Sequence, residues 1–307
     1  MVSPEAQAWH EGLRRFAQAA MGASGRVQSI EETRLAYWQA RKAATDPGGV
    51  AITETYAGGC RAYWQDPEGC AMDRVVLYLH GGGFYIGSPA SHERMVSHIA
   101  RAVGCRALNL DYRLAPEHPF PAAVEDCVAA YRWLLGQGYE PGHIAISGDS
   151  AGGGLALSTL LSLKEQGVPQ PAGAIPLSAF TDFLITGKSM ETNATSDLIA
   201  VGTPEEDFGP MRDRYLGEED PQNPLASPLY GDYSGLAPIY LQVGSAERLL
   251  DDSRRVAKKA KDADVDLKFE AFPDMQHVFQ STAGRSPEAD EAIGKIAEWL
   301  RPRLQLA

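Results

Sequence analysis

The sequence lacks an excess of positive charge and any long run of apolar residues, and each absence excludes a class of protein. The 307-residue chain carries 40 acidic side chains against 28 lysines and arginines, which gives a net charge of -12. An acidic surface repels nucleic acid and anionic membranes, and no basic run offsets it, so nucleic-acid binding is not expected. No apolar stretch approaches the length that crosses a bilayer, so membrane insertion is not expected either.

Cysteine is also scarce, and its spacing argues against a metal site. The four cysteines (Cys60, Cys70, Cys105 and Cys127) form no Cys-x-x-Cys pair and no cluster with histidine. We expect reduced thiols, with a Cys60–Cys70 disulfide as the open alternative. The N-terminus shows no basic region followed by an apolar run, the pattern typical of a signal peptide. These features predict a soluble, cytoplasmic protein.

Strand and helix signals alternate along most of the chain. Short apolar segments that read as strands are followed by longer segments with helical periodicity, as in residues 143–150 and then 152–167. Residues 52–66 are typical of a β-hairpin. This alternation predicts an α/β fold with a mostly parallel sheet covered by helices on both faces. Helical segments also occupy residues 1–45, and a polar, irregular segment with one or two helices spans about 181–230.

Ser150 is the candidate nucleophile. It stands at the centre of Gly-Asp-Ser-Ala-Gly, residues 148–152, which matches G-x-S-x-G. The motif alone also fits a glycine turn with an idle serine. Its position between a buried strand and a helix favours a nucleophile elbow, in which the sharp turn lifts the hydroxyl above the sheet. The helix N-terminus beside it stabilises developing negative charge.

A glycine-rich loop earlier in the chain is the candidate oxyanion hole. The segment His-Gly-Gly-Gly-Phe, residues 80–84, follows an apolar strand. Backbone N–H groups without side chains are well suited to bind an oxyanion, so we expect donors from Gly81, Gly82 and Gly83, with Ala151 as their partner. The loop matches neither the Walker pattern nor G-x-G-x-x-G, the two glycine patterns typical of phosphate binding. His80 is expected to be structural.

The candidate base and acid follow from chain order. In α/β-hydrolases the order is serine, then acid, then histidine, and His277 is the only histidine after Ser150. Glu247 lies just after a predicted strand, where an acid can orient the imidazole. Asp251 is the alternative, although it and Asp252 open a helix, where a capping role would explain them.

These four pieces resemble the hormone-sensitive-lipase-like branch, or family IV, of the α/β-hydrolase esterases. The resemblance rests on residues 80–84, 111–123, 148–153 and 275–279, and covers the chain from about residue 70 onward. It implies an eight-stranded catalytic sheet with a helical cap. In a single unit of residues 1–307, the cap would comprise about 1–45 plus about 181–230, and the core about 46–180 and 231–307.

The resemblance also assigns roles to individual residues. The family's acid-x-Leu-x-Asp pattern fits residues 247–251 with Glu247 as the acid, although the usual residue there is aspartate. It implies that residues 111–123 brace the oxyanion loop, with Arg113 and Glu117 paired. Relatives often dimerise through an exposed edge strand, and residues 265–272 could form one, so a homodimer is a further expectation.

The expected activity is a serine carboxylesterase that cleaves short- to medium-chain acyl esters through an acyl-serine, without metal or organic cofactor. The small-molecule ester would lie among candidate lining residues Phe84, Tyr85, Phe180, Phe183, Phe208, Met211, Tyr215, Val278 and Phe279. A lactonase, amidase or arylformamidase would use the same machinery, and fold does not decide between them. An alternative of another class is a small-ligand receptor that has lost catalysis.

Overall fold

One mixed sheet organises the protein. The structure is a computed structural model and describes residues 2–22, 29–40 and 43–306. Within these residues the eight strands run in the order β1-β2-β4-β3-β5-β6-β7-β8. Their bounds are β1 Val50–Ala57, β2 Cys60–Pro67, β3 Ala71–Leu79, β4 Cys105–Leu110, β5 Ile144–Asp149, β6 Gly173–Leu177, β7 Ile239–Gly244 and β8 Leu267–Phe272. The β1–β2 hairpin pairs antiparallel, β2 pairs antiparallel with β4, and every other neighbouring pair is parallel. The predicted α/β fold and its hairpin are confirmed.

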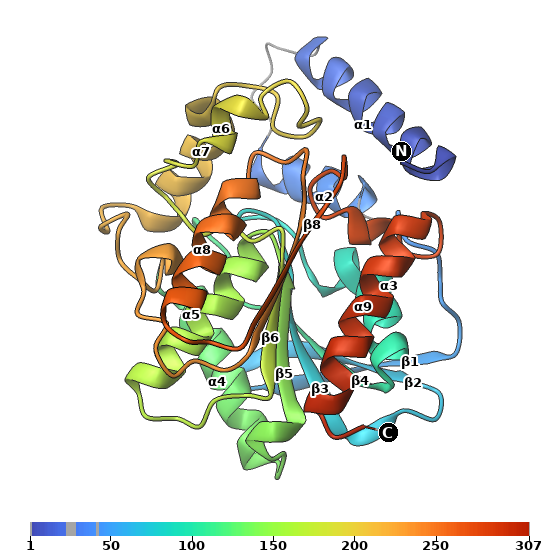
Figure 1. Ribbon diagram of the computed structural model, residues 1–307, viewed down its shortest axis with the longest axis vertical. Coiled ribbons are helices and arrows are strands. Elements are labelled where there is room, and N and C mark those ends of the chain that lie inside the picture. The colour runs from blue at the N-terminus through green and yellow to red at the C-terminus, as the bar shows by residue number, and fades with distance from the viewer. Residues whose placement is uncertain (1, 23–28, 41–42, 307) are drawn as a thin grey trace.

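Helices cover both faces of the sheet (Figure 1). The larger ones are α3 Pro89–Val103 and α9 Pro287–Arg303 on one face, and α4 Ala122–Gly136, α5 Ala151–Glu165 and α8 Leu250–Asp262 on the other. Each face has its own apolar core, and both cores draw on the central strands. Strand β5 is buried at every residue because it lies between these two layers.

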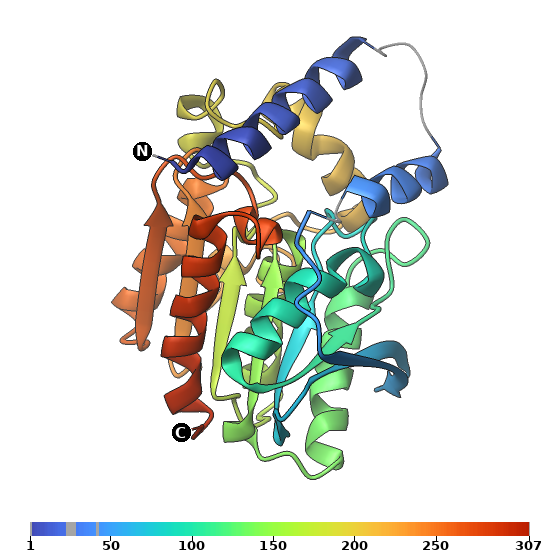
Figure 2. The same ribbon diagram turned by 90° about the vertical axis from the view of Figure 1, so that its right-hand side faces the viewer.

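Four further helices gather beyond the carboxyl ends of the parallel strands (Figure 2). They are α1 Pro4–Gly22, α2 Ile30–Ala40, α6 Ser189–Thr192 and α7 Pro204–Leu216. Local sequence sets the start of α7, where the Thr203 side chain and Glu206 form a capping box and Pro204 occupies the first turn. Short 3-10 turns span Pro141–His143, Pro228–Tyr230 and Phe279–Thr282. The predicted cap segments, about 1–45 and about 181–230, contain these four helices; residues 23–28 and 41–42 lie outside the described residues.

Candidate active site

Ser150 occupies a sharp turn between β5 and α5. Its φ of 55° and ψ of -120° lie in a region that non-glycine residues rarely adopt. The turn also brings backbones into close approach, because a methyl group at Gly152 would overlap the Leu79 carbonyl oxygen. Only glycine fits there. This strained geometry at the start of a helix is that of a nucleophile elbow.

His277 and Glu247 meet on the loops after β8 and β7. The Nδ1 atom of His277 lies 2.8 Å from Oε2 of Glu247. The Glu247 side chain is fully buried, whereas that of His277 keeps 15% of its surface exposed. Because the carboxylate engages Nδ1, the Nε2 atom is left for a second partner.

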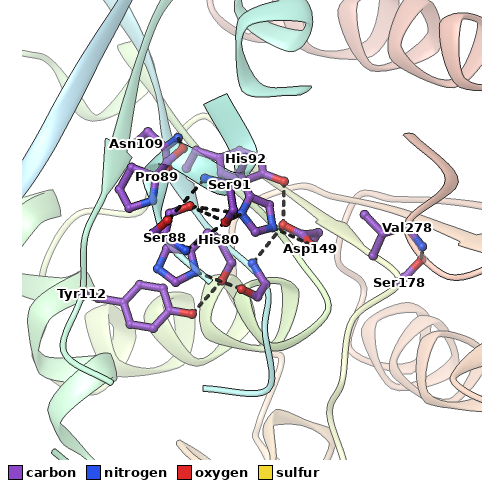
Figure 3. A network of polar contacts seen from close by, with 12 residues as sticks. His80, Ser88, Pro89, Ser91, His92, Asn109, Tyr112, Asp149, Ser178 and Val278 are labelled. Atoms are coloured by element: carbon purple, nitrogen blue, oxygen red, sulfur yellow. Dashed lines mark hydrogen bonds and ion pairs between the residues drawn. The ribbon is translucent and has the colours of Figure 1, made fainter. Parts of the chain in front are cut away.

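Ser178, directly after β6, joins the acid to the histidine loop. Its hydroxyl donates to Oε1 of Glu247 at 2.7 Å and accepts the N–H of Val278 at 3.1 Å. Figure 3 shows the Ser178–Val278 contact beside the polar network around Asp149. A single buried hydroxyl therefore contacts both the acid and the residue after the candidate base.

The same loop after β6 also holds the elbow. The Ser150 N–H donates to the Leu177 carbonyl at 2.8 Å, and the Phe180 N–H donates to the Ser150 carbonyl at 3.0 Å. The structure records no hydrogen bond between the Ser150 hydroxyl and His277 among the described residues. Contacts of this kind are often long in free enzymes and tighten when substrate binds. The carboxyl ends of β5, β6, β7 and β8 thus gather the candidate nucleophile, acid and base at one edge.

The other candidate acid points elsewhere. Asp251 accepts the Ser189 N–H at 3.0 Å and pairs with Arg254, so its carboxylate is directed to α6 and to its own helix. Asp252 is buried and accepts the N–H and hydroxyl of Thr181. Of the candidate acids, Glu247 is the one that the structure places against the imidazole.

Gly81 differs from the expected oxyanion donor. Its N–H donates to Oδ1 of Asp149 at 3.0 Å, so this group is occupied within the protein and the expectation for Gly81 is wrong. Within the described residues no hydrogen bond is recorded for the N–H groups of Gly82, Gly83 and Ala151. These three remain available to an oxyanion.

A buried polar network lies beneath the oxyanion loop (Figure 3). Asp149 also accepts the Tyr78 hydroxyl at 2.9 Å and lies 3.3 Å from Nε2 of His92. His80 stacks on the Tyr112 ring, with centroids 4.2 Å apart. Burial, together with the nearby His92, lowers the pKa of His80 to about 3, so this imidazole is neutral and structural.

Most of the expected pocket residues form one aromatic cluster, but few of them line an open space. Phe84 and Tyr215 stack at 4.0 Å, and both rings are almost fully buried. The cluster also includes Phe180, Phe183 and Phe208. The members of the expected set that keep exposed surface near the oxyanion loop are Tyr85, Phe208 and, slightly, Met211.

Two other pocket expectations are wrong. Val278 packs in the core between the sheet and helices α3 and α9. Phe279 packs against Phe272, in a third apolar cluster beside α1. The αL conformation of Val278, with φ of 53°, turns the chain sharply after His277 and directs these side chains away from the site.

The expected Arg113–Glu117 pair is also absent. Arg113 pairs with Asp126 at 2.7 Å, while Glu117 pairs with Arg34 of α2 at 2.7 Å. Arg34 further donates from Nε to the carbonyl of Tyr85, at the end of the oxyanion loop. The guanidinium holds the pKa of Glu117 at about 2. Through Glu117, the loop of residues 111–123 is thus tied to α2.

The four cysteines are free, so the alternative Cys60–Cys70 disulfide does not form. Across the described ranges, no cluster of three or more His, Cys, Asp and Glu side chains could hold a metal ion. None of the helices in the described part of the chain is both long and apolar enough to cross a bilayer.

Comparisons with known proteins agree with this geometry. Residues 76–281 match the family described as the alpha/beta hydrolase fold. An acetyl-hydrolase of Streptomyces hygroscopicus is 42% identical over 276 residues, which are 89% of this chain and 90% of the relative. A solved esterase of the bacterial hormone-sensitive lipase family superimposes with a TM-score of 0.92 at 44% identity, over 99% of each chain. An esterase whose crystal was soaked with p-nitrophenyl butyrate gives a TM-score of 0.91 at 41% identity, over 99% of each chain.

Proposed function

We propose that this chain, which belongs to the α/β-hydrolase family and within it to the hormone-sensitive-lipase-like esterases, is a serine carboxylesterase acting on short- to medium-chain acyl esters. The observation that carries the proposal is the 2.8 Å contact between His277 and the buried Glu247, on loops next to the strained Ser150 turn. This arrangement suits acyl transfer, in which a serine is activated by an oriented imidazole.

The first half of the reaction forms the acyl-enzyme. His277 Nε2 takes the Ser150 proton as the hydroxyl oxygen attacks the ester carbonyl. Glu247 holds the imidazole in the tautomer with a proton on Nδ1 and stabilises the imidazolium that forms. The imidazolium then gives its proton to the leaving alkoxide, and the alcohol departs from the acyl-serine.

The oxyanion is bound by backbone groups. The N–H groups of Gly82, Gly83 and Ala151 are the candidate donors, and Ala151 adds the positive end of the α5 dipole. Each such donor contributes about 3 kcal/mol to transition-state stabilisation. In the second half of the reaction water replaces the alcohol, and His277 activates it so that acid is released and Ser150 is restored.

Two further properties are part of the proposal. Among the described residues, strand β8 pairs with β7 alone, and a groove of about 460 Å³ lined by residues such as Phe269, Phe272 and Lys295 lies beside it. An open edge of this kind favours pairing with a second copy, so we propose a homodimer through β8. A light-scattering measurement that gives the mass of a single chain would contradict the homodimer proposal. The cytoplasmic location stays a prediction of the sequence.

The function is tested with p-nitrophenyl esters from acetate to dodecanoate. Wild type should cleave the acetate-to-hexanoate range faster than dodecanoate, and Ser150→Ala should have no measurable turnover. Circular dichroism of both proteins shows that the variant is folded. Binding of esters by wild type without any turnover would favour the receptor alternative. Faster cleavage of lactones or amides than of simple esters would identify a lactonase or an amidase instead.

A further inference from the structure

A short segment after α6 lies across the loop that carries Glu247. We name residues 193–198 the strap. Its first residue, Asn193, donates from Nδ2 to two carbonyl oxygens of that loop, at 3.0 Å to Ser245 and 2.7 Å to Glu247. One amide group therefore holds the main chain at the acid itself and two residues before it.

The strap also occupies the main-chain groups between and beyond these two. Ser196 Oγ donates to the carbonyl of Ala246 at 3.1 Å. Asp197 Oδ2 accepts the N–H of Arg248 at 2.8 Å, and both of these residues are buried. Side chains of the strap, which follows β6 in the chain, thus bond to the main chain of four consecutive residues, 245–248, in the loop after β7.

The strap binds the histidine loop as well. Gln276, next to His277, is 3% exposed. Its Nε2 donates to the Ser196 carbonyl at 2.8 Å, and its Oε1 accepts the Leu198 N–H at 2.8 Å. Both ends of the amide are therefore used on the strap, which fixes the main chain immediately before the candidate base.

We propose that the strap sets the register between Glu247 and His277, with Asn193 and Gln276 as positioning residues for the esterase reaction. This inference rests on the proposed function. The acid and the base lie on separate loops, and hydrogen bonds to one shared segment keep their 2.8 Å contact in place. Since a misplacement of about 1 Å can cost about 100-fold in rate, loosening either loop should slow the chemical step.

The strap belongs to the same chain segment as two of the helices over the sheet. The segment between β6 and β7 carries the strap together with α6 and α7, which lie over the carboxyl ends of the strands (Figure 1). A segment expected to select the substrate thereby also orders the catalytic pair. Changes in this segment should alter kcat even where they touch no substrate.

The test uses Gln276→Met, which keeps the length of the side chain and removes both hydrogen bonds, and Asn193→Ala, which removes both amide bonds from a side chain that is only partly buried. With p-nitrophenyl butyrate we expect kcat to fall about tenfold or more for each, with KM within about twofold of wild type. The dependence of kcat/KM on pH should also change, because a displaced Glu247 stabilises the imidazolium less. The double variant should lose less than the product of the two single losses, because both act through one pair.

A matched control is Gln170→Met. Gln170 likewise donates to a carbonyl, that of Leu160, and accepts an N–H, that of Ala237, but it lies at the opposite end of the sheet. It should lower the melting temperature and leave kcat and the pH profile unchanged. If Gln276→Met and Asn193→Ala behave like this control, the strap is only structural and the inference is overturned. Wild type and Ser150→Ala in the same assay separate that outcome from failure of the esterase proposal.

Discussion

The carboxylate of Asp149 accepts the backbone N–H of Gly81 at 3.0 Å, so the residue before the candidate nucleophile holds the first glycine of the oxyanion loop. The contact links two segments separated by 68 positions and lies in a fully buried environment. It places the remaining glycines of the loop next to the Ser150 turn without occupying their N–H groups.

Replacing Asp149 by Asn should disturb this alignment. The carboxylate accepts hydrogen bonds from the Gly81 N–H and the Tyr78 hydroxyl, and it also contacts Nε2 of His92. An amide in its place would turn an NH₂ donor toward one of these groups. We expect kcat for p-nitrophenyl butyrate to fall about 10- to 100-fold with little change in KM. Asp66→Asn, which weakens an ion pair with Arg106 away from the site, serves as the control. Equal kcat for Asp149→Asn and wild type would contradict this role.

The Arg34 contacts predict that α2 supports the oxyanion loop from outside. Arg34→Gln removes the bidentate pair with Glu117 and the bond from Nε to Tyr85. The pair is partly exposed, so the expected effect is modest, a several-fold fall in kcat/KM. Arg132→Gln, a surface change that breaks one bond to Gln166, should stay at wild-type rates. Indistinguishable kinetics for the two variants would show that α2 does not influence the loop.

Met211 of α7 should limit the acyl chain. Its sulfur lies close to Gly83, since a methyl group added at that glycine would come within 3.1 Å of it. Shortening Met211 to Ala opens space beside the oxyanion loop, so the ratio of dodecanoate to butyrate hydrolysis should rise several-fold. The measurement is kcat/KM for both esters in both proteins. A fall in both rates with an unchanged ratio would mean that Met211 only supports the loop.

Asp252 should make stability depend on pH. Burial, and then the nearby charge of Asp182, raises the pKa of Asp252 to about 7, against an ordinary value of about 4. Between these values the folded protein holds a proton that the unfolded chain has lost, so the free energy of unfolding falls as pH rises from about 4 to about 7. Arg255 also faces this carboxylate and opposes the shift.

Asp252→Asn removes that titration. The variant should therefore lose less stability than wild type between pH 5 and pH 8, by up to a few kcal/mol. Urea unfolding of both proteins at several pH values within this range measures the difference. Parallel stability curves would show that Asp252 does not carry a proton in the folded state near neutral pH.

The sequence could predict the elements of the fold and the neighbourhood of the site because these depend on local pattern and chain order. A buried apolar strand, a glycine turn and a histidine late in the chain can each be recognised from the sequence alone. The mostly parallel sheet and the helices on both of its faces agree with the predicted alternation of strands and helices, whereas the strand order was not predicted. Among the candidate acids, chain order alone could not separate Glu247 from Asp251.

Partner choice in three dimensions could not be predicted in the same way. Glu117 pairs with Arg34, 83 positions away, because α2 lies over its loop, whereas the family resemblance implied a pair with Arg113. Val278 and Phe279 follow the candidate base directly but turn away into separate cores. The bridging hydroxyl of Ser178 and the strap amide of Asn193 carry no motif, since ordinary polar residues gain their importance only from what the fold brings beside them.

The most direct test of the account compares Glu247→Gln with Asp251→Asn. Both changes replace a carboxylate by its isosteric amide, and they lie four positions apart in the chain. With p-nitrophenyl butyrate, the account predicts that Glu247→Gln lowers kcat by about 10²- to 10⁴-fold, as expected when the imidazole loses its orienting acid, while Asp251→Asn stays within a few-fold of wild type. The reverse result, with Asp251→Asn crippled and Glu247→Gln active, would contradict the assignment of Glu247 as the acid that orients His277.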